Sequence, residues 1–478
     1  MKHRRSSRRA LAVFLAALFL AAPTAAANLP LPAPEATSSI TGRDLKKHLS
    51  FLASDELGGR YTLSPSIRIA ARYLASELES YGYRGGARDG SFFQKVPLSF
   101  RSVDMTRSGL TLTVAGAKQE LKYADDFATQ TPTNLDLSGD LVFVGYGISS
   151  PGNNHDDYAG LDVKGKIVVA VSGIPSTLRG MRIGLEEQGI AAAQSRGAVA
   201  AIFIESQYLA QWGLVKSYIQ RESPSLPPMP TSSGAAFPSF LAGPGLVKAI
   251  AKAMNKDESY LTGTAGSPLK PAAIPASAAL KMAVTVKDAP PTFNVVGILE
   301  GSDPKLKNEY VVFSAHYDHL QTNRNGEVYN GADDDGSGTA GVLEIAQAFS
   351  VGPRSPRSIL IIFHTGEEMG LLGSLYNTDY EPIVPLKNLV ANFNIDMIGR
   401  SRQDGNNDPR DRELTDKDSV YVIGADKLSS ELHKISEDTN AATARMKLDY
   451  TYNDETHPQR FYYRSDHYNY AKHGIPVI

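Results

Sequence analysis

Hydrophobic and polar positions between residues 308 and 399 follow the pattern of a βαβ unit. The short apolar runs Val311–Phe313, Ile359–Phe363 and Phe393–Ile395 are β-branched and aromatic, as expected for buried parallel strands. Between the first two runs, Ser337–Phe349 places its apolar residues at helical spacing. This order predicts an α/β fold with a mixed, mostly parallel sheet flanked by helices. Such open sheets bind ligands at the carboxyl ends of their strands.

Polar side chains stand where these strands are expected to end. They are His316, Asp334, Glu367, Glu368 and Asp396. Each motif alone has an ordinary explanation, such as a turn before a helix or a solvated helix start. All of them in order within one βαβ-like stretch favour a metal site instead. Imidazole and carboxylate groups, in a chain without cysteine, indicate a hard or borderline metal, with zinc as the first candidate.

The order H-Y-D-H-L, N-G-A-D-D-D-G, G-E-E and N-I-D-M resembles that of the co-catalytic di-zinc exopeptidases. These are secreted bacterial aminopeptidases and, more distantly, glutamate carboxypeptidases. The resemblance implies two zinc ions per chain. It makes His316 a ligand of one zinc ion. It assigns Glu368 to one of the two ions and Asp396 to the other, and it makes Asp334 the bridge between them.

The same resemblance implies the catalytic roles. Glu367 would be the general base, and Asp318 would hold the other nitrogen of His316. A cis peptide bond would join Asp334 to Asp335. Tyr462, near the end of the sequence, would steady the oxyanion, with a packing role as the alternative. His319 and His364 match no ligand position of the family and are expected to support the site or the fold.

A second histidine ligand is the least determined part of the site. In the resembling enzymes each zinc takes one histidine, and the chain up to Asp396 offers only His316 for that purpose. His467 is the fallback. In the family, the segment around it begins a helix, and the ligand follows another strand. Here the sequence reaches Ile478 where that strand begins. We therefore expect a C-terminally truncated sequence, a fifth ligand beyond Ile478 and weak binding of the second zinc.

The first half of the chain separates into a helical part and a strand-rich part. Apolar stripes beginning at Leu45 and Ile67 predict two helices, with His48 as a packed histidine. Strands are expected over 110–114, 140–147, 166–171 and 199–204. Runs such as G-D-L-V-F-V-G-Y-G resemble a non-catalytic protease-associated domain. The expected organisation is a signal peptide 1–27, a linker 28–40, the first peptidase part 41–120, an insert 121–285 and the catalytic part 286–478.

The N-terminus has the composition of a secretory signal. A basic stretch precedes the apolar residues 10–22, which are too few to span a bilayer, and Ala25–Ala27 fits the small-residue cleavage rule. An uncleaved anchor is the alternative. We expect an exported protein, periplasmic or extracellular, with no stable membrane span after cleavage.

Overall charge excludes one class of partner. The chain has 49 basic and 51 acidic residues, so it carries no electrostatic footprint for nucleic acid. Peptides are the expected substrates, and an aminopeptidase is the leading hypothesis. The alternatives are a carboxypeptidase of the same fold, a metal-depleted binding homologue, and a single-zinc enzyme that cyclises N-terminal glutamine.

Overall fold

The strand ends expected to carry the site belong to a mixed sheet with the order β1-β16-β18-β17-β19, in which β2 also pairs with β16. β17 runs parallel to both β18 and β19, as predicted, while β16 runs antiparallel to β18. The strands are β1 (Arg84–Gly85), β2 (Phe93–Val96), β16 (Thr292–Leu299), β17 (Tyr310–His316), β18 (Ser358–His364) and β19 (Leu389–Asn394).

The computed structural model describes residues 33–478 apart from 130, 180, 182, 185–186, 220–223, 228–236, 263–267, 324 and 456. The expected signal peptide, residues 1–27, lies outside the described residues. Within the described ranges, no helix combines the length and the apolar character needed to cross a membrane.

One face of this sheet is covered by three helices, α3 (Gly42–Leu52), α4 (Pro65–Ser80) and α10 (Gly338–Val351). The first two confirm the predicted apolar stripes. Each begins at a hydroxyl cap, because Thr41 Oγ1 accepts from Asp44 N and Ser64 Oγ accepts from Ile67 N. The buried face of α4 packs on the sheet through Ile67, Ala70, Ala71, Leu74 and Leu78.

The opposite face is covered by C-terminal segments. α14 (His467–Ala471) and the residues after it pack on β16, β17 and β18 through Tyr470, Ile475 and Val477. Pro476–Ile478 runs beside β19, with Ile478 N donating to Asn392 O at 3.0 Å. The remaining elements here are α11 (Leu372–Leu375), β20 (Ser419–Tyr421), α12 (Ala425–Leu428), α13 (Ser430–Ala442) and β21 (Lys447–Asp449).

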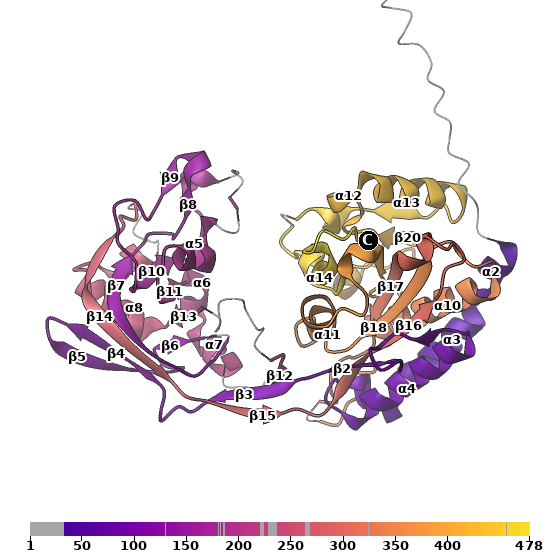
Figure 1. Cartoon of the computed structure of the whole chain (residues 1–478), viewed down its shortest axis with the longest axis horizontal. Helices are drawn as coiled ribbons and strands as arrows, with labels where there is room; N and C mark the ends of the chain where they lie inside the picture. The colour runs from indigo at the N-terminus through magenta and orange to yellow at the C-terminus, as the bar shows by residue number, and fades with distance from the viewer. Residues whose placement is uncertain are drawn as a thin grey trace, which may run out of the picture.

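A second lobe is built on an eight-stranded sheet with the order β5-β4-β14-β7-β10-β11-β13-β6 (Figure 1). Its strands are β4 (Gly109–Val114), β5 (Ala117–Lys122), β6 (Phe127–Ala128), β7 (Leu135–Phe143), β10 (Ile167–Val171), β11 (Ala200–Ile204), β13 (Ser239–Ala242) and β14 (Ala272–Met282). The short strands β8 (Ser149–Ser150) and β9 (His155–Asp156) form a separate pair. Its helices are α5 (Gly189–Ser195), α6 (Ser206–Ala210), α7 (Trp212–Ile219), α8 (Pro244–Ala253) and α9 (Glu258–Leu261).

This lobe begins earlier than the expected boundary at residue 121. β4 pairs with β14 from Gly109 to Val114, and β5 pairs with β4. Leu110 and Leu112 lie in the core of the second lobe. The boundary therefore moves to the segment before Gly109, because the strands that precede residue 121 bury their apolar side chains in the second lobe.

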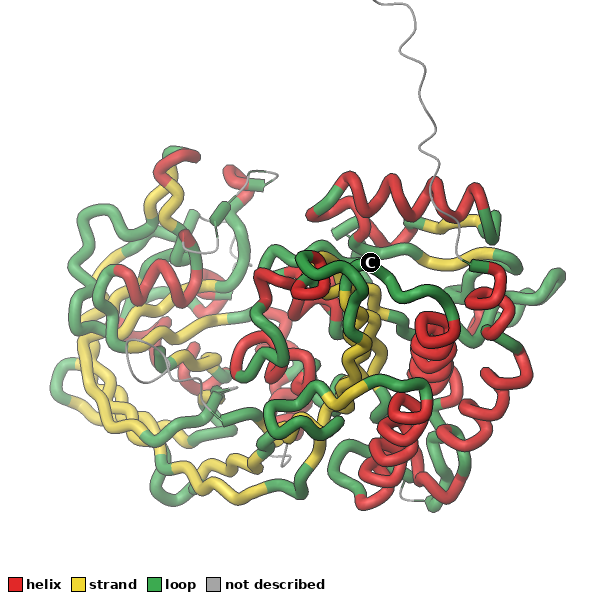
Figure 2. Tube along the Cα trace, turned by 45° about the vertical axis from the view of Figure 1, so that its right-hand side comes forward, coloured by secondary structure: helices red, strands yellow, loops and turns green. Residues whose placement is uncertain are grey.

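Two long chain segments connect the lobes. β3 (Ser99–Val103) leads into the second lobe and β15 (Val284–Asp288) leads back, and the two strands pair antiparallel (Figure 1). β12 (Pro224–Ser225) extends this small sheet. Leu226, which follows β12, packs with Leu372 of α11. In the tube view of Figure 2, strand segments joined by loops run along the lower edge of the molecule between the lobes.

Candidate metal centre

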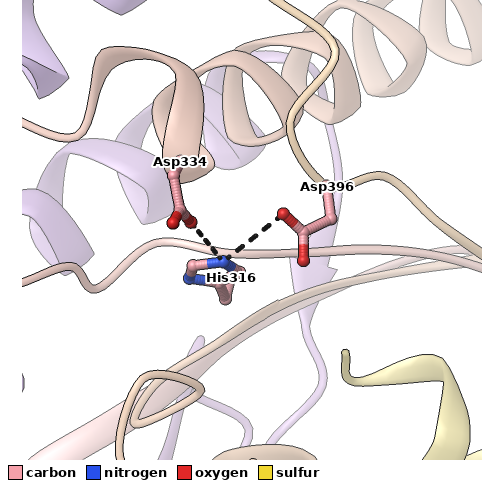
Figure 3. A group of neighbouring side chains, drawn as sticks. All are labelled: His316, Asp334 and Asp396. Atoms are coloured by element: carbon pink, nitrogen blue, oxygen red, sulfur yellow. Dashed lines mark ion pairs between the residues drawn. The ribbon is translucent and has the colours of Figure 1, made fainter. Parts of the chain in front are cut away.

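The carboxyl ends of β17 and β19 bring three predicted ligands together (Figure 3). His316 is the last residue of β17, Asp334 lies in the loop Ala332–Ser337 before α10, and Asp396 follows β19. His316 Nε2 lies 3.1 Å from Asp334 Oδ1 and 3.8 Å from Asp396 Oδ1. Within the part of the chain that the structure describes, these atoms form the first of two groups of side chains that could hold a cation.

A second group shares one member with the first. His319 Nδ1 lies 2.6 Å from Glu368 Oε1 and 3.9 Å from Asp334 Oδ2. Asp334 therefore points one oxygen at His316 and the other at His319. A bridging carboxylate has this arrangement. Asp396 and Glu368 fall into different groups, and their assignment to different metals stays a prediction.

His319 is the member of this cluster that sequence analysis did not select. It follows Asp318 in H-Y-D-H-L and matches no ligand position of the resembling family. The available signal was its position three residues after His316, at the same sheet edge as the other ligands. His364 behaves as expected, since it is fully buried and its Nε2 contacts Tyr470 Oη at 3.2 Å.

The acidic loop is fixed by the buried carboxylate of Asp335. Its Oδ2 accepts from His316 N at 3.2 Å, and its Oδ1 accepts from Gly338 N at 2.9 Å and from Met397 N at 3.1 Å. It therefore joins the end of β17, the start of α10 and the segment after β19. The expected cis peptide bond between Asp334 and Asp335 is present.

Arg60 holds the other side of this loop. Its fully buried guanidinium donates to the carbonyls of Tyr317 (2.8 Å), Asn330 (2.7 Å) and Gly331 (2.8 Å), and also to that of Leu52. A Cβ at Gly331 would lie 2.6 Å from Arg60 Nη2, so glycine is needed for this approach. Burial lowers the pKa of Arg60 to about 10, which leaves it charged at neutral pH.

Asp318 lies beside the other nitrogen of His316, and the role expected for it there stays a prediction. His316 Nδ1 is 3.1 Å from the backbone oxygen of Asp318 and 3.8 Å from its carboxylate, so the nearer acceptor is the backbone. The carboxylate accepts from Thr62 Oγ1 at 2.7 Å and from Glu367 N at 3.1 Å. Asp318 thus positions the backbone of Glu367 as well as facing the histidine ring.

The electrostatics of the first group favour a positive charge. Burial of His316 opposes its charged form, but Asp318, Asp334 and Asp396 outweigh burial and raise its pKa well above the ordinary value. Burial is also the main cause that raises the pKa of Glu367 to about 10. The residues therefore fit a bound cation, which would satisfy several carboxylates at once.

The segment after Arg464 supports this group from the side. Ser465 Oγ donates to Asp396 Oδ2 at 2.7 Å. His467, the fallback ligand, belongs to neither group, and its buried Nε2 has no hydrogen-bond partner among the described residues. Burial lowers the pKa of His467 to about 4. The ring of Tyr462 packs against that of His467 and lies in the core under α14. This position is compatible with the packing role given above as the alternative. The oxyanion role of Tyr462 stays a prediction.

At the edge of the sheet in this α/β fold, two imidazole–carboxylate groups share one aspartate, Asp334. This arrangement defines a candidate co-catalytic two-metal centre. Residues 294–478 match the model of Peptidase family M28.

Curated relatives are similar over a shorter stretch. Aminopeptidase YwaD of Bacillus subtilis is 37% identical over 109 residues, covering 23% of this chain and 22% of that protein. Leupeptin-inactivating enzyme 1 of Streptomyces exfoliatus is 32% identical over 108 residues, covering 22% and 23%. The matched stretch thus spans about a fifth of the length of these relatives. Among solved structures, the aminopeptidase from Aneurinibacillus sp. strain AM-1 aligns over 93% of this chain and 85% of its own, with 20% identity and a TM-score of 0.44.

Proposed function

We propose that this protein is a zinc-dependent aminopeptidase that removes N-terminal residues from peptides with two zinc ions per chain. The observation that carries the proposal is the position of Asp334, whose two oxygens face two different groups of ligands. The family match and the names of the aminopeptidase relatives support the same activity.

The donor set suits zinc at both positions. Imidazole nitrogen and carboxylate oxygen are ordinary zinc ligands. His316, Asp334 and Asp396 would hold one ion, while Asp334 and Glu368 would contribute to the other. Bound zinc would polarise the scissile carbonyl and make a water molecule acidic enough to lose a proton near neutral pH.

Glu367 is the residue that we propose to move that proton. It adjoins Glu368, its backbone N–H donates to Asp318 Oδ1, and its carboxylate lies 3.8 Å from His316 Nε2. In this arrangement Glu367 accepts the proton of the attacking water and passes it to the leaving amine. Cations bound nearby would lower the pKa of Glu367 from its raised value, because positive charge favours the carboxylate form.

Charge around the acidic loop favours an aminopeptidase over a carboxypeptidase. A carboxypeptidase needs a free cationic side chain for the terminal carboxylate of its substrate. The guanidinium of Arg60 is buried among backbone carbonyls, and Arg400 Nε pairs with Asp333 Oδ2 at 2.7 Å. Among the described residues, Arg60 and Arg400 contact this loop, and both are therefore already engaged.

Metal removal and a matched substrate panel test the proposal. Exhaustive chelation should abolish hydrolysis of aminoacyl substrates, and zinc should restore it with two ions per chain. The same peptides with an acetylated N-terminus should be left intact. A single zinc ion would favour the cyclising enzyme, and none would favour a binding homologue. Activity on blocked peptides with a free C-terminus would make the protein a carboxypeptidase.

The outer parts of the chain have proposed roles as well. We propose that residues 1–27 direct export and are cleaved, which N-terminal sequencing of the exported protein would test. The second lobe is proposed to be a non-catalytic, protease-associated type of insert that controls substrate access. Its removal should change KM or substrate range while zinc stays bound, and a folded core that binds no zinc would contradict this.

A further inference from the structure

We propose that Leu226, a residue of the second lobe, positions the turn that carries Glu367 and Glu368. We call this turn, residues 366–372, the Glu-Glu turn. The inference rests on the activity proposed above and adds a contribution of the second lobe to turnover, beyond its control of substrate access. Leu226 acts through its packing with Leu372, so it is a positioning residue and not a catalytic one.

Backbone hydrogen bonds close the Glu-Glu turn around the proposed base. The N–H groups of Gly370 and Leu371 both donate to Glu367 O at 2.9 Å, and Leu372 N donates to Gly366 O at 2.9 Å. Gly366 and Leu371 have positive φ angles of 69° and 59°. Because leucine seldom adopts this left-handed conformation, the turn keeps its shape only while its surroundings hold it.

An apolar cluster fixes the end of the Glu-Glu turn. Leu372 is buried in this cluster, and Met369 packs against it from within the turn. The other buried members are Val96, Leu98 and Leu226. Among the described residues of the cluster, Leu226 is the one that the second lobe supplies, because it lies between α7 and β13 in the chain. The Glu-Glu turn is therefore packed against residues of both lobes.

The backbone on both sides of Leu226 is attached to neighbouring elements. On one side, β12 pairs antiparallel with β3. On the other side, Tyr380 Oη donates to Pro227 O at 2.8 Å, and Tyr380 also packs against the apolar cluster. Leu226 lies between these two attachments and is only 8% exposed. Its side chain therefore has a fixed place in the cluster.

The two ends of the Glu-Glu turn are held in different ways. Asp318 Oδ1 accepts from Glu367 N at 3.1 Å, which is a polar contact within the catalytic lobe. The side chain of Leu372 depends on apolar packing instead. Truncating Leu226 would leave a cavity beside Leu372, because the surroundings of a deleted side chain relax only partly. A misplacement of about 1 Å can lower a rate about 100-fold, so a small movement of the turn would be measurable in turnover.

Steady-state kinetics of the full, zinc-loaded chain test this role with three variants. Leu226→Ala should lower kcat for an aminoacyl substrate by roughly 10-fold or more, with KM and zinc content unchanged. Leu226→Met, which keeps the volume of the side chain, should recover most of the loss. Leu246→Ala is the matched control, because Leu246 is fully buried in the core of the second lobe and lies outside the cluster; its kcat should equal that of wild type.

Hydrogen exchange gives a readout that does not depend on activity. In Leu226→Ala, the backbone N–H groups of Gly370, Leu371 and Leu372 should exchange roughly 10-fold faster or more than in wild type, because the turn opens more often. In Leu246→Ala these groups should exchange as in wild type, although amides of the second lobe exchange faster. Mass spectrometry of a peptide that spans the Glu-Glu turn would measure both.

The outcomes separate positioning from the simpler roles of Leu226. A changed KM with unchanged kcat and unchanged exchange would overturn the inference and leave Leu226 as a tether that affects access only. An equal loss of kcat in Leu246→Ala would also overturn it, because the effect would then be general destabilisation of the second lobe.

Two further results keep the test decisive. If Leu226→Ala does not fold, Tyr380→Phe replaces it, because this variant removes only the hydroxyl that donates to Pro227 O. It should lower kcat and speed exchange of the Glu-Glu turn to a smaller extent, and wild-type values would overturn the inference. A wild-type chain without zinc-dependent aminopeptidase activity would overturn the proposed function, and the exchange rates would still decide whether Leu226 positions the turn.

Discussion

Replacing Arg60 with methionine should reveal how strongly the acidic loop depends on one buried cation. Methionine keeps much of the length of the side chain but removes all five guanidinium N–H groups. The carbonyls of Leu52, Tyr317, Asn330 and Gly331 would then lose their charged donor. Two of these carbonyls immediately precede the loop that carries Asp334.

The expected cost follows from those contacts. A buried acceptor left without a partner costs roughly 1–3 kcal/mol. Removing the charge also relieves the burial penalty that lowers the pKa of Arg60. We therefore expect the free energy of unfolding of Arg60→Met to fall by about 4 kcal/mol. That is a large share of the roughly 5–15 kcal/mol available to a folded protein.

Arg400→Met provides the matched control. Arg400 contacts the same loop through Asp333, but its side chain is 55% exposed, so its loss should cost about 1 kcal/mol or less. Urea unfolding of the chelated proteins, followed by far-UV circular dichroism, would measure both. An Arg60→Met protein within about 1 kcal/mol of wild type, or equal costs for the two variants, would refute the reasoning.

Further expectations concern catalysis, metal affinity and pH. Glu367→Gln should keep both zinc ions and lower kcat by roughly two to four orders of magnitude, whereas Glu368→Gln should lower zinc content; steady-state kinetics with metal analysis would show whether these assignments are reversed. Ser465→Ala removes the donor to Asp396 and should weaken zinc binding about 10–100-fold, with unchanged affinity counting against a supporting role. The pKa of His467 is 6.5 in the unfolded chain and about 4 in the folded protein. The stability that the neutral ring contributes is therefore present above pH 6.5, and about 3 kcal/mol of it is lost as the pH falls towards 4. His467→Gln should flatten this part of the pH profile in urea unfolding of the chelated protein, and an unchanged profile would exclude His467 as its source.

The sequence predicted the elements that carry a regular apolar pattern. β17, β18, β19 and α10 were recognisable because their buried residues recur at strand or helix spacing. The residues at their ends followed from the topology, since parallel strands present their carboxyl ends at one edge. His316 and Asp334 are adjacent in the structure for that reason.

Other features left no such pattern. Arg60 and Asp335 are charged residues that look like surface positions until the fold buries them, and the partners of Arg60 are backbone atoms that no sequence pattern distinguishes. The proximity of His319 to Glu368 depends on the path of a loop after β17. The start of the second lobe was placed too late because β5, with five of its six residues exposed, carries little apolar signal.

The antiparallel pairing of β3 with β15 has a consequence for the order in which the chain folds. β2 and β16 are neighbours in the catalytic sheet, yet Val96 and its partner Thr292 are about 200 residues apart in sequence. Closing so long a loop from an unfolded chain carries an entropy cost that slows folding. If the second lobe folds first, the pairing of Val103 with Val284 already holds the two ends of that loop side by side. The folded lobe then holds the two ends of the loop together, so the pairing of β2 with β16 requires only a short loop to close.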